Sequence, residues 1–266
     1  MLLGCACFCP KSERRIITHT DVFSTNAIVL FLRFAEVGAH ILSGNVFEPR
    51  ALDELIPGWR DDESCPVKTR VESDDFKFLL NETTAVPLPV PPMLHNDGNY
   101  IISLGQLCRW LGEKAEDMGV EVIPAYPAAR LLVEDGNVKG VITSDMGVDK
   151  EGKPKDSFML GAEVRGKQTV LAEGCRGNCS EEAMETFNLR EHADPQTYGL
   201  GLKEVWRVND PENHPAFRPG HVQHSLGWPL PQDTYGGSFL YCMEPDLVLI
   251  GFVVGLDYPN PYMSPY

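Results

Sequence analysis

The residues best placed for chemistry follow an apolar stretch in the middle of the chain. Gln168–Ala172 has the composition of a buried strand, and Glu173-Gly174-Cys175-Arg176-Gly177 comes directly after it. Open α/β sheets bind nucleotides beyond the carboxyl ends of their strands. No G-x-G-x-x-G motif precedes this segment, and Gly199-Leu200-Gly201 lacks a third glycine. The residues alone therefore indicate a nucleotide-dependent α/β protein.

Two histidines lie in glycine-containing segments that could contact a cofactor. His40 is within VGAHILSG, and His95 is within LHNDGNY. Loop glycines let backbone amides approach a flat or anionic ligand closely. Both histidines are therefore candidate cofactor contacts.

Other catalytic and metal signals are weak. The chain has no G-x-S-x-G, H-E-x-x-H or Walker A motif. Cys5, Cys7 and Cys9 could hold a soft metal, but a frayed terminus explains them better. His221 and His224 lack an acidic partner for a metal. We predict neither a catalytic acid–base residue nor a metal ligand.

Composition narrows the class of protein. The 266 residues include 38 acidic and 23 basic side chains, which gives a formal net charge of −15. Such an acidic chain is a poor general nucleic-acid binder. The longest apolar run, Leu247–Leu256, is far shorter than the roughly 20 residues that span a bilayer. The eight cysteines are scattered rather than paired, which fits a reducing compartment.

The expected elements form a mixed α/β architecture. The segment Gly44–Trp59 has one apolar helix face, with Pro49 near its first turn, and Leu104–Met118 forms a helix that Gly119 ends. Glu134-Asp135-Gly136-Asn137 is a strong hairpin signal. Beyond Pro195, dense glycines and aromatics predict a mostly antiparallel sheet. Further expected elements are strands at Ala27–Leu32 and Val120–Ile123, and a polyproline-type connector at Val86–Pro92.

From about Ala35 to Tyr266 the chain closely resembles the electron transfer flavoprotein–ubiquinone oxidoreductases. The stretches that carry the resemblance are EVGAHILSGNVFEPRALDELIPGW, LHNDGNYIISLGQLCRWLGEKAEDMGVEVIPAY, VLAEGCRGN, PQTYGLGLKEVW, GWPLPQDTYGGSFLY and VVGLDYPNPYMSPY. They are long, collinear and rich in glycine, tryptophan and tyrosine. The TYGGSF and LDYPNPY blocks speak against another reductase of the same superfamily, such as a geranylgeranyl-reductase-like protein.

The resemblance implies a function, cofactors and partners. Such an enzyme passes electrons from electron transfer flavoprotein, through a four-iron–four-sulfur cluster and FAD, to ubiquinone. It is peripheral on the matrix face of the mitochondrial inner membrane, although Arg14 and Arg15 make an unconvincing transit peptide because Glu13 and Asp21 accompany them. The Gly44–Trp59 element would match the family's membrane-dipping segment, with core packing as the alternative.

The resemblance also implies the site residues. For FAD they are Gly38, Ala39, His40, Ser43, Gly44, Glu173 and Gly174. For ubiquinone they are Tyr235, Gly236 and Gly237, where the paired glycines offer backbone groups to the quinone carbonyls. Phe239 would add apolar contact. A β-bulge or tight turn is the alternative explanation of the glycine pair.

The departures from the family predict an incomplete portion of it. The strand, G-x-G-x-x-G and helix that hold the FAD pyrophosphate are replaced by CACFCP, and Leu32 stands where an acid is expected eight residues before His40. The cluster cysteines would lie beyond Tyr266. We predict three regions: an unassigned segment at 1–33, a partial FAD-binding domain of glutathione-reductase-like type at 34–190, and an incomplete ubiquinone-binding domain at 191–266. A non-catalytic fragment is the alternative to an active enzyme portion.

Overall fold

A computed structural model describes residues 16–17, 28–31, 36–39, 41 and 44–266. The chain divides into two compact units. The first comprises residues 1–39 and 111–194, and the second comprises residues 40–110 and 195–266. The return to the second unit at Pro195 lies close to the predicted boundary. Residues 40–110 group with the carboxyl-terminal part, so each compact unit takes in two separate stretches of the chain.

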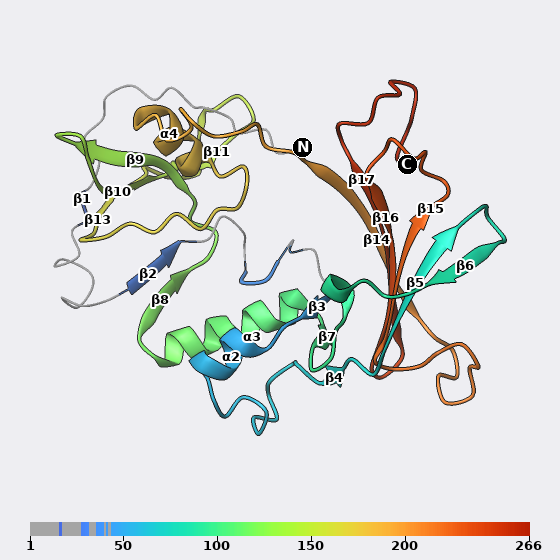
Figure 1. Cartoon of the computed structure of the whole chain (residues 1–266). Helices are drawn as coiled ribbons and strands as arrows, with labels where there is room; N and C mark the ends of the chain where they lie inside the picture. Colours follow the sequence, from blue (N-terminus) through green and yellow to red (C-terminus); the bar gives the residue numbers. More distant parts are fainter. Residues whose placement is uncertain (1–15, 18–27, 32–35, 40, 42–43) are drawn as a thin grey trace. The chain divides into compact units, whose positions relative to one another are not determined.

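The described residues of the first unit form small sheets, helix α4 and the end of helix α3 (Figure 1). One sheet has the order β1-β13-β10-β9, and two-stranded sheets pair β11 with β12 and β2 with β8. Helix α4 (Asn178–Thr186) contributes Cys179 and Ala183 to a buried cluster with Leu131 and Val141. The strands are β1 (Ile16–Ile17), β2 (Ile28–Phe31), β8 (Val120–Ile123), β9 (Ala128–Glu134), β10 (Asn137–Thr143), β11 (Met146–Val148), β12 (Pro154–Met159) and β13 (Glu163–Arg165).

Two local predictions are confirmed in this unit, the hairpin at Glu134–Asn137 and the strand at Val120–Ile123. The expected hairpin is β9–β10, and its turn residues Asp135 and Gly136 have φ values of 49° and 73°. Both values are left-handed, as a tight hairpin turn requires. The expected strand Val120–Ile123 is β8, and it pairs in parallel with β2 inside the predicted strand Ala27–Leu32, whose end residues lie outside the described part.

The predicted strand Gln168–Ala172 is wrong. The segment is an irregular coil, and the side chain of Val170 is 86% exposed. A strand needs a neighbour for its backbone hydrogen bonds, and no strand pairs with this segment in the part of the chain that the structure describes. Its apolar sequence is therefore not buried.

The second unit is organised by a six-stranded sheet of order β14-β17-β16-β15-β5-β6 (Figure 1). Neighbouring strands within this sheet are antiparallel, except that β5 and β15 are parallel. This confirms the mostly antiparallel sheet expected beyond Pro195. The strands are β5 (Ser73–Leu79), β6 (Ala85–Leu88), β14 (Gly199–Arg207), β15 (His221–Gly227), β16 (Gly236–Met243) and β17 (Leu247–Gly255). The Val86–Pro92 segment is thus an edge strand in part, since Pro87 pairs with Lys77.

One face of this sheet packs against a three-stranded sheet. The smaller sheet has the order β3-β7-β4, from β3 (Asn45–Phe47), β7 (Tyr100–Ile102) and β4 (Thr69–Arg70). Val71, Ile101, Val222, Tyr241 and Leu249 form the buried cluster between them, and Val46 and Phe239 pack onto it. The short helix η1 (Pro92–Leu94) precedes β7.

The predicted helix over Gly44–Trp59 is mostly wrong. Helix α2 spans only Arg50–Leu55, with Pro49 at its N-cap. Pro57-Gly58 ends it, and Trp59 turns back so that its indole N–H donates to Asp53 at 2.7 Å. Trp59 is 1% exposed while Leu55 is 69% exposed, so the expected single apolar face does not form.

The second predicted helix is confirmed. Helix α3 spans Leu104–Asp117, and Gly119 follows it with a φ of 87°, as a left-handed C-cap requires. The mixed α/β fold class is also confirmed.

Candidate functional site

The predicted FAD contacts near residue 40 fall in both units. Gly38 and Ala39 lie in a turn of the first unit, where the Ala39 N–H donates to the Glu36 carbonyl at 3.3 Å. Gly44 lies in the second unit, immediately before β3, with a φ of 84°. His40 and Ser43 lie outside the described residues. Gly38 has a φ of 78°, so both glycines take a conformation that side chains disfavour.

The Glu173 carboxylate accepts hydrogen bonds from the start of α4, which the sequence did not predict. The donors are the Ser180 N–H at 2.7 Å and the Ser180 hydroxyl at 2.9 Å. These contacts satisfy free amide groups at the start of α4. Gly174 has a φ of 76°, and among the described residues, its two chain neighbours apart, no atom lies within 4 Å of the position that a Cβ would take. The backbone of Gly174 is therefore open to a ligand, whereas the carboxylate of Glu173 is engaged.

The paired glycines lie inside a regular ladder. Gly236 and Gly237 begin β16, where they pair with Val254 and Val253 without a register shift. The β-bulge or turn explanation is therefore wrong. A Cβ on Gly236 would meet the Val253 carbonyl of β17, and one on Gly237 would meet the Ser225 carbonyl of β15. Close packing of neighbouring strands already requires glycine at both positions.

The other two residues expected near the quinone lie in different surroundings. The Tyr235 side chain is 84% exposed, and its carbonyl accepts from the Gly255 N–H at 2.7 Å. Phe239 instead packs on the buried cluster and stacks on Tyr241, with 4.6 Å between ring centroids. Phe239 thus stabilises the sheet.

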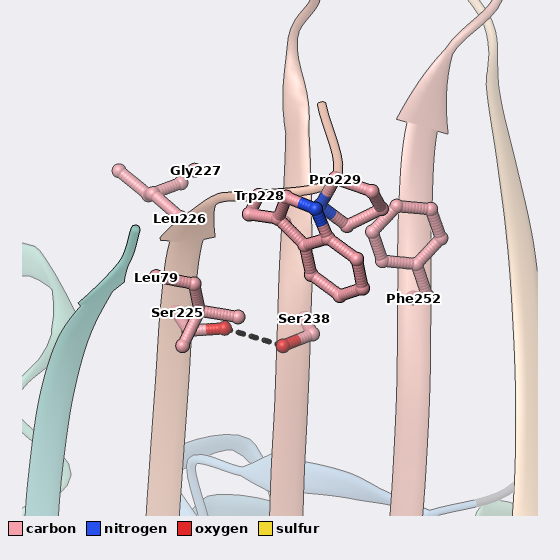
Figure 2. A pocket seen from close by; sticks show the side chains of 9 residues that line it. Leu79, Ser225, Leu226, Gly227, Trp228, Pro229, Ser238 and Phe252 are labelled. Atoms are coloured by element: carbon pink, nitrogen blue, oxygen red, sulfur yellow. Dashed lines mark hydrogen bonds between the residues drawn. The ribbon is translucent and has the colours of Figure 1, made fainter. Parts of the chain in front are cut away.

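A pocket of about 200 Å³ opens beside Gly237 at one end of the large sheet. Figure 2 shows the rings of Trp228, Pro229 and Phe252 close together, and the Ser225 and Ser238 hydroxyls hydrogen-bonded to each other. The remaining lining residues are Leu79, Leu226, Gly227, Pro229 and Phe252. The pocket is therefore mainly apolar, with one hydroxyl pair. Sequence reasoning found only Gly237 among its residues.

The histidines expected to be poor metal ligands are occupied by other contacts. His221 Nδ1 lies 2.8 Å from the Ser73 hydroxyl, and His224 Nε2 lies 3.0 Å from the Tyr241 hydroxyl. Burial lowers the pKa of both imidazoles, and it raises the pKa of Tyr241 to about 12. Within the described ranges, no group of three or more His, Cys, Asp or Glu side chains could hold a metal ion.

Two polar groups near Gly44 were not found by sequence reasoning. The Lys203 ammonium group lies 2.5 Å from the position that a Cβ on Gly44 would take. Asn45 Oδ1 is buried and has no hydrogen-bond partner among the described residues. Buried polar atoms without partners are uncommon and call for a reason. No local sequence signal marks either group, because each depends on contacts that the fold creates.

Two family models match the chain. The model described as "ETF-QO, ubiquinone-binding" matches residues 198–266, and the model described as "FAD binding domain" matches residues 83–210. The two matches share residues 198–210, which include all of β14.

Two related proteins support the predicted resemblance. The chain is 51% identical over 241 residues to a probable electron transfer flavoprotein-ubiquinone oxidoreductase, mitochondrial, from Schizosaccharomyces pombe, covering 90% of this chain and 37% of that protein. An electron transfer flavoprotein-ubiquinone oxidoreductase from Pseudomonas aeruginosa is 48% identical, with 87% and 42% covered. The resemblance is confirmed, and the chain spans about two fifths of the length of these relatives.

Solved structures share the fold at low sequence identity. A geranylgeranyl bacteriochlorophyll reductase-like protein from Thermoplasma acidophilum matches with a TM-score of 0.58 at 16% identity, covering 85% of this chain and 50% of that one. The myxobacterial chondrochloren halogenase, a FAD-dependent halogenase, matches with a TM-score of 0.55 at 16% identity, covering 86% and 47%. These likenesses establish the fold, which the FAD-dependent halogenase shares.

Proposed function

Since this chain is related over nine tenths of its length to the electron transfer flavoprotein–ubiquinone oxidoreductases, we propose that it is the flavin- and quinone-binding portion of such an enzyme. In this proposal, electrons from electron transfer flavoprotein pass through a four-iron–four-sulfur cluster and FAD to ubiquinone. The observation that carries the proposal is the near-50% identity, which includes the segment matched by the ubiquinone-binding family model.

The proposed FAD contacts are Gly38, Ala39, His40, Ser43, Gly44, Glu173 and Gly174. Three of these fit the role by their backbone: Gly38, Gly44 and Gly174 have left-handed conformations that only glycine adopts readily. The open space beside Gly174 would admit a ligand. Bound FAD would supply the redox chemistry, and the chain's own residues would position it and exclude water. Glu173 would act indirectly, by fixing the segment through its contacts to α4.

The proposed quinone contacts are Tyr235, Gly236 and Gly237. The quinone carbonyls accept hydrogen bonds, and a glycine backbone can approach a flat ring without steric hindrance. The last registered pair between β15 and β16 is Ser225 with Ser238, so the edge of Gly237 that faces β15 lies beyond that ladder. The pocket beside Gly237 adds an apolar surface that would suit a quinone.

The remaining parts of the proposal follow from the relatives. The cluster would take its ligands from parts of the enzyme other than these 266 residues. The enzyme would lie on the matrix side of the mitochondrial inner membrane as a peripheral protein. Among the described residues, no helix is long and apolar enough to cross a membrane. The membrane-dipping role of Gly44–Trp59 stays a prediction; Leu55 is exposed there, but Trp59 is buried.

One observation favours a second candidate, a non-catalytic fragment. Gln168–Ala172 directly precedes Glu173-Gly174 and lies exposed without a strand partner among the described residues. An unpaired apolar segment at a cofactor contact weakens binding, because ordering it on binding costs conformational entropy. An exposed apolar backbone edge also promotes aggregation.

The decisive experiment is flavin binding by the purified 266-residue chain. FAD is added, unbound flavin is removed by gel filtration, and the flavin absorbance bands are compared with the protein concentration. One bound flavin per chain, reoxidised by a short-chain ubiquinone after dithionite reduction, is the result that the enzyme portion requires. A colourless and aggregating chain would instead establish the fragment.

A further inference from the structure

Lys203 differs from the other cations of the large sheet. Lys77 donates to Gln223 at 2.5 Å and lies 3.8 Å from Asp75, and Arg207 lies 3.3 Å from Asp246. Lys203 has no hydrogen bond or ion pair with any residue that the structure describes. Its side chain is half-buried, and this burial lowers the pKa of its ammonium group. A partly desolvated cation without a counter-charge is unfavourable in the protein alone.

The fold holds this cation against the backbone of Gly44. Lys203 pairs with Gly251 across β14 and β17, in the middle of the ladder, so its backbone is fixed. A Cβ on Gly44 would lie 2.5 Å from Lys203 Nζ and 2.8 Å from Leu249 Cδ1. Gly44 also has a φ of 84°. The glycine therefore leaves room for the lysine head group, and a larger residue would displace it.

The chemistry of the missing partner follows from this position. An ammonium group is a donor and a positive charge, so its partner must be an acceptor with negative charge. A flavin that has taken up two electrons and one proton, the proton on N5, carries one negative charge on its N1–C2=O edge. The protein tunes a flavin through charges near these atoms. Ubiquinone is neutral and offers no such charge.

We propose that Lys203 is a positioning residue for the flavin, and that its ammonium group lies at the N1–C2=O edge and favours the reduced, anionic form. The inference rests on the proposed FAD site at Gly44. Lys203 keeps its proton throughout, so it acts by charge and by hydrogen bonding. It lies within both segments that the FAD-binding and ubiquinone-binding family models match.

The test compares the unmodified chain with Lys203→Met, which keeps the unbranched shape and removes the charge. FAD affinity and the two-electron midpoint potential of bound flavin are measured with dithionite and reference dyes. A charge-assisted hydrogen bond predicts a preference for reduced over oxidised flavin that falls about tenfold or more on substitution. Tenfold corresponds to a midpoint potential about 30 mV lower for a two-electron couple.

Matched variants separate charge from packing. Arg207→Met removes an exposed cation from the same strand and should leave the potential unchanged. Lys203→Gln keeps a polar head group without charge and should lower the potential as Lys203→Met does. Thermal unfolding should show no loss of stability in Lys203→Met, since an uncompensated cation is removed; if that variant fails to fold, Lys203→Gln decides.

Each outcome is decisive. Equal potentials in the unmodified chain and both Lys203 variants would overturn the role of Lys203 and leave the proposed function standing. An unmodified chain that binds no FAD would overturn the proposed function, and this assignment with it. A lowered potential with Arg207→Met unchanged supports the assignment.

Discussion

The buried clusters of the two compact units differ in how far apart in the sequence their residues lie. The cluster of the first unit comes from Leu131, Val141, Cys179 and Ala183, within one continuous stretch. The cluster of the second unit joins both parts of that unit, since Val71 and Ile101 pack there with Val222, Tyr241 and Leu249. Bringing distant segments together costs loop-closure entropy, which a large buried cluster must offset. The second unit can therefore build sites from residues that no local motif connects.

The largest expected effect tests whether the units are independent. Ile101 is 1% exposed at the centre of the second unit, and Ile101→Ala should lower its free energy of unfolding by about 3–4 kcal/mol. All four tryptophans, Trp59, Trp110, Trp206 and Trp228, lie in the second unit. Urea unfolding followed by tryptophan fluorescence should therefore report this loss directly.

The matched variant is Leu131→Ala, at a site 4% exposed in the first unit. It should cost about 2–4 kcal/mol there, visible in far-UV circular dichroism, while the fluorescence midpoint stays in place. If Leu131→Ala lowers the fluorescence midpoint as much as Ile101→Ala does, the units unfold together and the contrast between them is wrong.

A smaller effect is expected at the start of α4. Glu173→Gln removes the negative charge that accepts from Ser180, so α4 should lose about 1 kcal/mol of stability. Amide hydrogen exchange should speed up at the first turn of α4, and the second unit should be unaffected. Glu185→Gln, an exposed position near the other end of α4, is the control. Unchanged exchange in Glu173→Gln would exclude the capping role.

The smallest expected effect is a difference between the two units in how their stability depends on pH. Burial lowers the pKa of His221 and His224 below 6.5, so the unfolded chain binds more protons below about pH 6.5. The second unit should then lose stability as the pH falls through this value.

Burial, with Glu173 and Glu182, raises the pKa of Cys179 from 9.0 to about 12. The unfolded thiol ionises first, so the first unit should lose stability as the pH rises above 9.0.

Urea unfolding at a series of pH values measures both trends. His224→Asn should flatten the acid loss seen by fluorescence, whereas His192→Asn, at an exposed position in the first unit, should not. Cys179→Ala should flatten the alkaline loss seen by circular dichroism. An unchanged acid slope in His224→Asn would show that burial of that imidazole does not govern the stability of the second unit.

Sequence reasoning succeeded where the signal was local. The Asp135-Gly136 turn and the Gly119 cap require left-handed backbone, which few residues other than glycine adopt, so their positions could be predicted. The predictions were wrong where the burial of a segment depends on which other segment of the chain covers it. Gln168–Ala172 has a strand-like composition but is exposed, and Gly44–Trp59 has helical spacing that Pro57-Gly58 interrupts. Apolar spacing indicates that a segment can be buried but cannot identify what covers it.

In the candidate site too, features of single residues could be predicted, whereas contacts between distant residues could not. The family resemblance and the mixed α/β class could be predicted from the residues and are confirmed, whereas the glycines at 38, 44, 174, 236 and 237 stay predicted contacts. Only the tertiary structure placed Lys203 against Gly44, engaged Glu173 at α4, and set Gly237 beside the Trp228 pocket. The physical reason is that glycine's freedom is a property of one residue, whereas desolvation and pairing of a charge depend on residues that meet only when the sheet has formed.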